Sequence, residues 1–210
     1  MKSIFPSFVA AFITLMVIGF DDQKPGTAPN GWTVAMTGEG SPQWTVENDR
    51  TAPSAPNVLK QAGTASFPLC IKDDISLKDG FAEVKFKPLA GKEDQAAGIV
   101  WRYRDPQNYY LVRASALANN VVLCKVEQGT LSSLDIVGGK AGSGLKQNVE
   151  NGKWQKLRVQ FVGDRFTVLL DGKRLFQVLD QTFPDAGKVG VCTTADSVTL
   201  FDDFSCGKKR

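Results

Sequence analysis

The sequence predicts an all-β fold, a single-domain antiparallel β-sandwich of the jelly-roll type. Segments that alternate apolar and polar residues recur along the chain, and turn signals separate them at spacings of about ten residues. No segment shows the 3.6-residue period of an amphipathic helix. The chain has 210 residues, of which 42% are hydrophobic, which is enough for one sizeable core.

The strands are clearest near the C-terminus. Trp154–Val162 alternates apolar and polar residues, the pattern of a strand with one buried face. Asp171-Gly172 joins two further apolar runs, Arg165–Leu170 and Lys173–Leu179, and this dipeptide favours the type I′ turn of a hairpin. The other predicted strands are Ala65–Ile71, Phe81–Lys87, Ala97–Arg104, Asn108–Ala114, Asn120–Gln128, Lys188–Thr193 and Ser197–Cys206.

The N-terminus has the pattern of a targeting segment. After Lys2, the run Phe8–Phe20 is uncharged and mostly apolar, and Asp21 ends it. Its length is typical of a signal-peptide core and short for a membrane span, although an uncleaved anchor is the alternative. We therefore expect a signal peptide at 1–20, a linker at 21–31, the sandwich at 32–206 and a basic tail at 207–210. The mature protein is expected to be exported, to the periplasm or the extracellular space, with no membrane contact once the leader is cleaved.

Composition excludes several functions. The chain contains no histidine, which removes Ser-His-Asp triads, His-liganded zinc hydrolases and facial-triad iron enzymes. The net charge is only +3, and the basic residues are scattered, so nucleic acid is not an expected partner. Oligomeric state is not indicated by the sequence.

Acidic residues occur as the pairs Asp73-Asp74, Glu93-Asp94 and Asp202-Asp203. Adjacent residues on a strand point to opposite faces, so such a pair cannot work together as glycosidase carboxylates without a bulge. The pairs are either turn residues or ligands of a structural calcium ion. No other cofactor and no metal-ligand residues are predicted.

The hairpin from Trp101 to Arg113 carries the densest group of aromatic and arginine side chains, with Asp105-Pro106-Gln107-Asn108 as its turn. Planar guanidinium groups and aromatic faces suit the hydroxyls and C–H faces of a sugar, although the same residues also form ordinary cross-strand pairs. The predicted ligand-binding residues are Trp101, Arg102, Tyr109, Tyr110, Arg113, Asn119 and Asn120. Asn119 and Asn120 are alternatively turn residues.

Strict alternation divides this hairpin between two faces. On the first arm, Val100 and Arg102 are expected to share one face, and Trp101 and Tyr103 the other. On the return arm, Tyr110 and Val112 are expected on one face. Tyr109, Leu111 and Arg113 are expected on the opposite face. The three aromatic candidates therefore cannot all line one surface.

Four segments of the chain resemble secreted bacterial proteins of the concanavalin A-like lectin/glucanase superfamily, of the family 16 glycosidase-like or 3-keto-disaccharide hydrolase-like kind. They are Ala97–Tyr110, Asn119–Leu123, Gly187–Val191 and Thr194–Phe204. The resemblance implies two curved antiparallel sheets with saccharide bound on or beside the concave face. The acidic E-x-D-x-E strand of the glucanases is absent here.

The resemblance makes a carbohydrate-binding, lectin-like module the leading functional hypothesis, with a saccharide or polysaccharide as partner. A glycoside hydrolase or sugar lyase is the first alternative, for which Glu83, Asp105 and Glu127 are the candidate catalytic acids. A laminin-G-like adhesion module that binds protein is the second alternative.

The four cysteines are too sparse for a disulfide scaffold. Cys70 is expected to be a small buried hydrophobe. Cys124 and Cys192 stand where similar proteins are expected to have aromatic residues. If one bridge forms, this resemblance favours Cys124–Cys192, and at least two thiols are expected to remain free.

Overall fold

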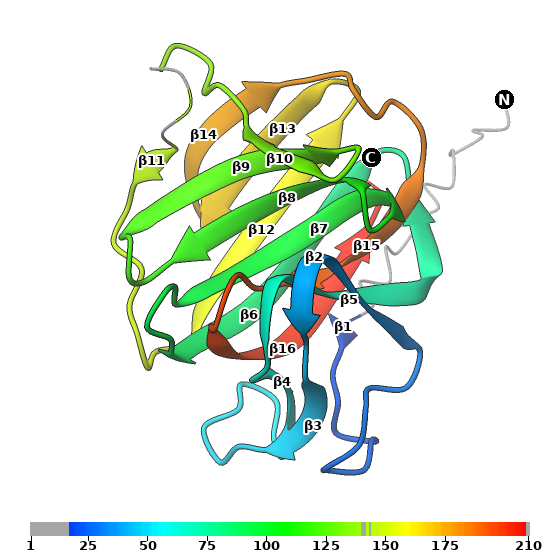
Figure 1. Ribbon diagram of the computed structural model, residues 1–210, viewed down its shortest axis with the longest axis vertical. Coiled ribbons are helices and arrows are strands. Elements are labelled where there is room, and N and C mark those ends of the chain that lie inside the picture. Colours follow the sequence, from blue (N-terminus) through cyan, green and yellow to red (C-terminus); the bar gives the residue numbers. More distant parts are fainter. Residues whose placement is uncertain (1–16, 140–141, 143, 209–210) are drawn as a thin grey trace, which may run out of the picture.

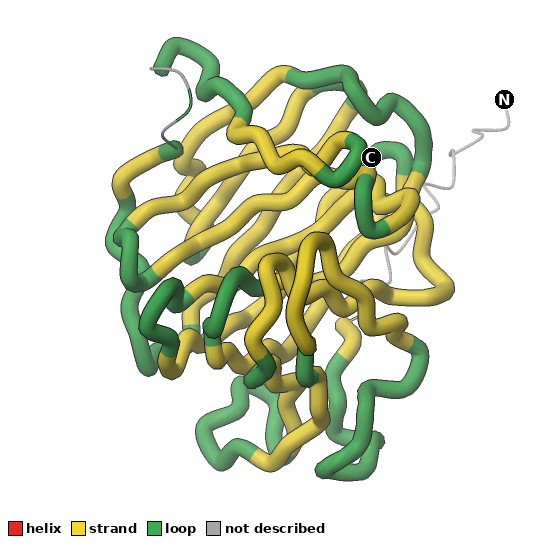
Figure 2. The backbone as a smooth tube through the Cα atoms, viewed as in Figure 1, coloured by secondary structure: helices red, strands yellow, loops and turns green. Residues whose placement is uncertain are grey.

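A computed structural model describes residues 17–139, 142 and 144–208. These residues form strands and loops without a helix, arranged as two stacked antiparallel sheets (Figures 1 and 2). The predicted all-β sandwich is confirmed. Residues 1–16 of the predicted leader and residues 209–210 of the basic tail lie outside the described residues, and the signal peptide stays a prediction.

The front sheet faces the viewer in Figure 1. Its strands, in spatial order, are β10 (Thr130–Ser133), β9 (Asn120–Glu127), β8 (Asn108–Ser115), β7 (Ala96–Asp105), β15 (Gly187–Cys192), β5 (Thr64–Leu77) and β2 (Trp32–Ser41), with β11 (Leu145–Lys146) also paired to β9.

The back sheet lies behind it. Its strands, in spatial order, are β14 (Lys173–Leu179), β13 (Arg165–Leu170), β12 (Gln155–Val162), β6 (Gly80–Ala90), β16 (Val198–Gly207), β4 (Asn57–Gln61) and β3 (Trp44–Asn48), with β1 (Val17–Ile18) paired to β16.

The main core fills the space between the sheets. On β12, Leu157, Val159 and Phe161 are completely buried, as their alternation predicts. The Trp101 ring from β7 stacks against Phe161, with 6.1 Å between the ring centroids. Aromatic side chains from both sheets thus meet in one apolar layer, whose removal from water stabilises the sandwich.

The segment before Trp32 packs against this sandwich. Phe20 is buried against Trp32, with ring centroids 5.9 Å apart. In the predicted linker 21–31, the Gly26 amide donates to the Val46 carbonyl at 2.7 Å, and Asp21 accepts the Asn57 amide at 2.9 Å. Residues 21–31 are therefore held as a loop against β3 and β4.

A β-bulge changes the faces of the first hairpin arm. The β7–β8 register shifts between Trp101 and Asp105, and Arg102 has a φ of 49°. Tyr103 consequently packs in the same outer cluster as Val100, whereas the Arg102 guanidinium lies 5.5 Å from the ring centroid of the core residue Phe166. The expectation that Val100 and Arg102 share a face was wrong, because the bulge re-aims the side chains that follow it.

The buried Arg102 side chain ties three loops to the end of the sandwich. Its Nε donates to the Lys78 carbonyl at 3.1 Å, Nη1 to Phe183 at 2.8 Å and Nη2 to Gly163 at 2.6 Å. Only 1% of the side chain is exposed, and burial lowers the pKa of its guanidinium. Nη2 also lies 3.5 Å from Asp79 Oδ1, so Arg102 is a buried structural donor.

A second irregularity folds the β2–β5 ribbon over the outer face of the front sheet. The register between these strands shifts between Thr37 and Gly40, where Gly38 has a φ of 79°. At this bend, Thr37 Oγ1 lies 2.7 Å from Tyr109 Oη and donates to the Pro106 carbonyl. Because β5, β15 and β7 separate β2 from β8 in the sheet, this contact requires strong curvature, which makes the outer face of the front sheet concave.

Replacing Arg102 with alanine is expected to lower the free energy of unfolding by about 3 kcal/mol, because three loop carbonyls lose their shared donor. Arg104→Ala is the matched control. Arg104 forms an exposed pair with Asp185 at 3.1 Å, so its loss should cost less than about 1 kcal/mol. Urea denaturation of both variants measures the difference. Equal, small losses would contradict the structural role of Arg102.

Candidate functional site

A groove of about 390 Å³ opens on the concave face of the front sheet, and we call it the front groove. Strands β8 and β9 supply its floor, β10 supplies one wall and Phe67 from β5 stands on the other side. It is lined by Phe67, Leu111, Arg113, Asn120, Val122, Cys124, Leu131, Ser133, Gly142 and Thr194. The lining combines apolar surface with a small set of polar groups, as small-molecule sites commonly do.

Among the described residues of this lining, Arg113 is the one charged side chain. Its Nη1 donates to Asp94 Oδ2 at 2.8 Å, and 27% of the side chain remains exposed. Within the described part of the chain, this is the only hydrogen bond found for the guanidinium. Arg113 is therefore held in place by one donor while its remaining N–H groups stay available to a ligand.

Asp94 connects the groove to three other parts of the chain. Besides Arg113, its carboxylate accepts hydrogen bonds from Thr194 Oγ1 at 2.6 Å, Ser115 Oγ at 2.5 Å and the Gln95 amide at 2.8 Å. Only 7% of the residue is exposed. Because both oxygens already hold two donors, the carboxylate positions Arg113 rather than offering a free base.

The loop that carries Asp94 is itself fixed. Asp196 accepts the backbone amides of Lys92 at 2.7 Å and of Glu93 at 2.9 Å. These hydrogen bonds hold the pKa of the Asp196 carboxyl below its ordinary value. The chain of contacts from Asp196 through Asp94 to Arg113 thus orders the polar end of the groove.

Asn120 also lines the front groove. Its Oδ1 is buried and has no hydrogen-bond partner among the described residues. Leaving a buried amide oxygen without a hydrogen bond costs free energy. Rotation of the Asn120 side chain would let this oxygen accept a hydrogen bond from a hydroxyl group in the groove. The structure therefore brings together two of the predicted ligand-binding residues, Arg113 and Asn120.

The other predicted binding residues lie elsewhere. Trp101 and Tyr110 are completely buried between the sheets, 5.5 Å apart and stacked. Tyr109 is on the concave face, but the bent β2–β5 ribbon covers it through Thr37. Asn119 has a φ of 49° in the exposed β8–β9 turn. The three predicted aromatic residues therefore have no exposed ring face for a sugar to stack on. Arg102 is buried as well.

The three candidate acids do not meet in one site. Glu83 is on the back sheet, where it pairs with Arg158 at 3.2 Å and Lys156 at 3.5 Å. Asp105 caps the β7–β8 turn by accepting the Gln107 amide at 2.7 Å. Glu127, at the end of β9, pairs with Lys125 at 3.1 Å. None of the three lines the front groove.

The cysteines are free thiols at all four positions, Cys70, Cys124, Cys192 and Cys206. The favoured Cys124–Cys192 bridge is therefore absent, and the reason is topological. Strands β8 and β7 lie between β9 and β15, so three interstrand spacings, about 14 Å along the sheet, separate the two backbones. A disulfide requires Cα atoms within about 7 Å.

Across residues 17–139, 142 and 144–208, no three His, Cys, Asp or Glu side chains are grouped so that they could hold a metal ion. In the same ranges, no helix has the length and hydrophobicity needed to span a membrane. In each acid pair considered as turn residues or calcium ligands, at least one carboxylate accepts a hydrogen bond from a protein group. Asp202, for example, accepts the Ser54 amide at 2.9 Å.

The sequence predicted neither the aromatic wall of the front groove nor the carboxylate that positions Arg113. Phe67 is half-buried and supplies the aromatic wall, but it lies in a predicted strand, and its residue type gives no sign that it is partly exposed. Asp94 was considered only as a turn residue or calcium ligand. Its partner Thr194 is 100 residues away, and no local pattern reveals such a contact.

Comparison with known proteins identifies related folds. A family model described as the 3-keto-alpha-glucoside-1,2-lyase-like domain matches residues 19–203. The carbohydrate-binding module CBM66 from Bacillus subtilis has a TM-score of 0.67 at 20% identity, covering 85% of this chain and 96% of that one. No curated protein sequence matches the chain.

Two further solved structures share the fold. The cellulose-induced protein Cip1 has a TM-score of 0.60 at 13% identity, covering 93% of this chain and 98% of that one. The exoplasmic/lumenal domain of VIP36, in a Ca²⁺/Man-bound form, has a TM-score of 0.52 at 13% identity, covering 93% and 89%. The relationship to concanavalin A-like sandwiches is confirmed.

Asp94→Ala is expected to lower the free energy of unfolding by about 3 kcal/mol, because buried hydroxyls of Ser115 and Thr194 and the Arg113 guanidinium lose a common acceptor. The adjacent, exposed Glu93 provides the control. Glu93→Ala should change stability by no more than about 0.5 kcal/mol. Chemical denaturation followed by circular dichroism checks both values. A mild Asp94→Ala phenotype would mean that the network is dispensable.

The four thiols are expected to react with a colorimetric disulfide reagent after denaturation without reductant. In the folded protein at neutral pH the reaction should be slow, because burial raises the pKa of Cys124 and of Cys206 to about 11 and raises that of the other two thiols as well. Thiol counting before and after unfolding makes the measurement. A count of two in denaturant would show that a disulfide forms.

Proposed function

This chain belongs to the family of 3-keto-alpha-glucoside-1,2-lyase-like domains, and on that premise we propose that it is a carbohydrate-binding sandwich whose ligand lies in the front groove. The observation that carries the proposal is the Arg113 guanidinium, fixed by Asp94 and partly exposed in the lining. Its planar set of N–H donors suits the neighbouring hydroxyls of a sugar ring.

The remaining lining is consistent with the same ligand. Phe67 offers an aromatic surface for the C–H face of the ring, and Asn120 and Ser133 add hydrogen-bonding groups of the kind that orient hydroxyls. Solved structures with this fold include a carbohydrate-binding module and a mannose-bound domain. These relatives support the choice of ligand class.

Sugar cleavage is the alternative that the family description suggests. A 1,2-elimination from a 3-ketoglucoside removes the C2 proton to a base, forms the C1–C2 double bond and expels the C1 oxygen substituent. The front groove contains no carboxylate among its described lining residues, and burial raises the pKa of the Cys124 thiol to about 11, further from that of a useful base at neutral pH. The groove therefore favours binding over elimination.

Export is part of the proposal. The apolar run Phe8–Phe20 after Lys2 supports delivery through a signal peptide to the periplasm or the extracellular space, where polysaccharides are accessible. Mass determination of the N-terminus of the protein recovered from culture fractions tests this part separately.

Arg113→Ala is expected to weaken saccharide binding by about tenfold or more, because the fixed donor group is lost. A glycan array identifies the ligands of the parent protein, and calorimetric titration then measures affinity. Arg165→Ala, an exposed arginine on β13 of the back sheet, is the control and should leave affinity unchanged. The melting temperature of Arg113→Ala should fall by only a few degrees, since Asp94 keeps three other donors.

The cleavage alternative is tested on the same material. Methyl 3-keto-α-glucoside is incubated with the protein, and release of methanol is followed. We expect no release. Turnover would shift the assignment to a lyase, and Glu83→Gln, Asp105→Asn and Glu127→Gln would then identify the acid on which it depends. An array with no saccharide bound would leave protein adhesion as the better hypothesis.

A further inference from the structure

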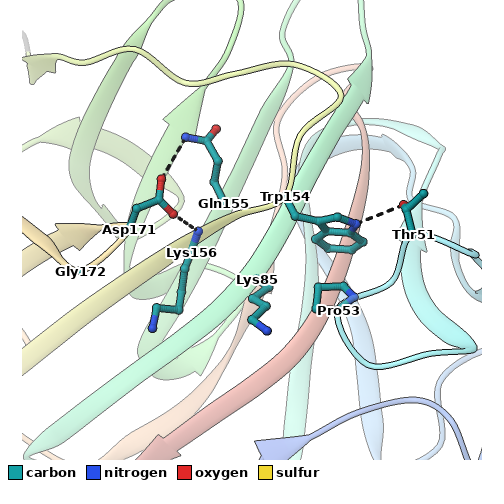
Figure 3. A pocket seen from close by; sticks show the side chains of 8 residues that line it. All are labelled: Thr51, Pro53, Lys85, Trp154, Gln155, Lys156, Asp171 and Gly172. Atoms are coloured by element: carbon teal, nitrogen blue, oxygen red, sulfur yellow. Dashed lines mark hydrogen bonds between the residues drawn. The ribbon is translucent and has the colours of Figure 1, made fainter.

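A second pocket lies on the back sheet, away from the front groove (Figure 3). It has a volume of about 520 Å³. Its lining comes from the loop before β4, from β6, from the start of β12 and from the β13–β14 turn, and comprises Thr51, Pro53, Lys85, Trp154, Gln155, Lys156, Asp171 and Gly172. We call it the Trp154 pocket.

Trp154 differs from the other tryptophans of the chain. Trp32, Trp44 and Trp101 are buried, with 7%, 3% and 0% of their surface exposed, whereas Trp154 is partly exposed. Its indole Nε1 donates to Thr51 Oγ1 at 3.2 Å, and the Lys87 ammonium lies 5.8 Å from the ring centroid. The ring is therefore held in one orientation while part of its surface lines an open pocket.

Asp171 supplies an acceptor on the other side of the pocket, as Figure 3 shows. One carboxylate oxygen accepts the Lys156 backbone amide at 2.7 Å, which fixes the group. Among the described residues, the other has a single long contact of 3.4 Å, from Gln155 Nε2. The positive φ of Asp171 and Gly172, 49° and 78°, belongs to the tight turn that holds this carboxylate over β12. The second oxygen can accept hydrogen bonds from hydroxyl groups.

The lysines of the pocket are compensated by acids outside the lining. Lys85 and Lys156 are opposite each other on β6 and β12. Lys85 pairs with Asp203 at 2.7 Å, and Lys156 lies 3.5 Å from Glu83. An anionic ligand would have to compete with these carboxylates. The charge distribution therefore favours an uncharged ligand.

We propose that the Trp154 pocket is a second saccharide site, specific for a neutral sugar ring that stacks on Trp154 and hydrogen-bonds to Asp171. An exposed, oriented indole suits the C–H face of a pyranose or furanose ring, and a fixed carboxylate suits its hydroxyls. The site differs from the front groove in sheet, residues and aromatic group, so it does not depend on saccharide binding at Arg113.

Tryptophan fluorescence tests the proposal directly, because Trp154 is the tryptophan that acrylamide should reach. The probes are neutral hexasaccharides of β-1,4-glucan, β-1,3-glucan, xylan, mannan and levan. At least one is expected to protect Trp154 from acrylamide quenching in the parent protein and equally in Arg113→Ala. Calorimetry on Arg113→Ala then isolates the second site, and Trp154→Ala in that background should weaken binding by about tenfold.

Lys153→Ala, an exposed neighbour on the same loop, is the control and should bind as the parent does. If the alanine variant is unstable, Trp154→Phe replaces it, because it keeps an aromatic ring, and it should bind with intermediate affinity.

The proposal is overturned if no neutral hexasaccharide protects Trp154, or if oligogalacturonate protects it better than every neutral probe. Protection that disappears in Arg113→Ala would also overturn it, since that would indicate one site. If a sugar still protects Trp154 and Arg113→Ala leaves total binding unchanged, the Trp154 pocket is supported and the front groove is not the saccharide site.

Discussion

The contact of Thr37 with Tyr109 and Pro106 determines which part of the front sheet is open to solvent. The outer face of this sheet carries apolar residues, including Val100 and Leu111, that would be exposed on a flat sheet. Curvature and the folded β2–β5 ribbon remove them from water. The groove around Arg113 is the part of the concave face that this covering leaves open. The position of the front groove therefore follows from which part of the outer apolar cluster the β2–β5 ribbon leaves uncovered.

Within that opening, the Asp94 carboxylate fixes Arg113, the arginine that we propose as a ligand-binding residue. A free arginine side chain loses considerable rotamer entropy when it binds, and this loss weakens affinity. Here the hydrogen bond to the Asp94 carboxylate already restricts the rotamers of Arg113. Asp196 in turn accepts the backbone amide of Asp94 and so orders the loop that carries it. The same arrangement explains why two arginines of one hairpin have different roles. Arg102 donates to three loop carbonyls and contacts Asp79, whereas Arg113 makes one hydrogen bond among the described residues, to Asp94.

Sequence patterns predicted the elements whose limits are set locally. The bounds of β13 and β14 match the predicted ones, because Asp171-Gly172 ends one strand and begins the next. The bulge at Arg102 could not be read from alternation, since alternation assumes a regular strand. Likewise, Arg113 was identified from its residue type and position, but its partner Asp94 was not. That contact depends on how β7, β8 and the loop before them come together in three dimensions.

The Trp154 pocket and the front groove lie on the outer faces of different sheets, so the thickness of the sandwich separates them. A short oligosaccharide bound in one cannot bend around the molecule to reach the other. Two ring-sized sites of modest affinity would therefore engage separate chains, or distant parts of one chain. On an insoluble polysaccharide, binding at one site raises the effective concentration of ligand at the other only where a second chain is within reach. Such a domain would distinguish packed polysaccharide from dissolved oligosaccharide through geometry, even if each pocket recognised the same sugar.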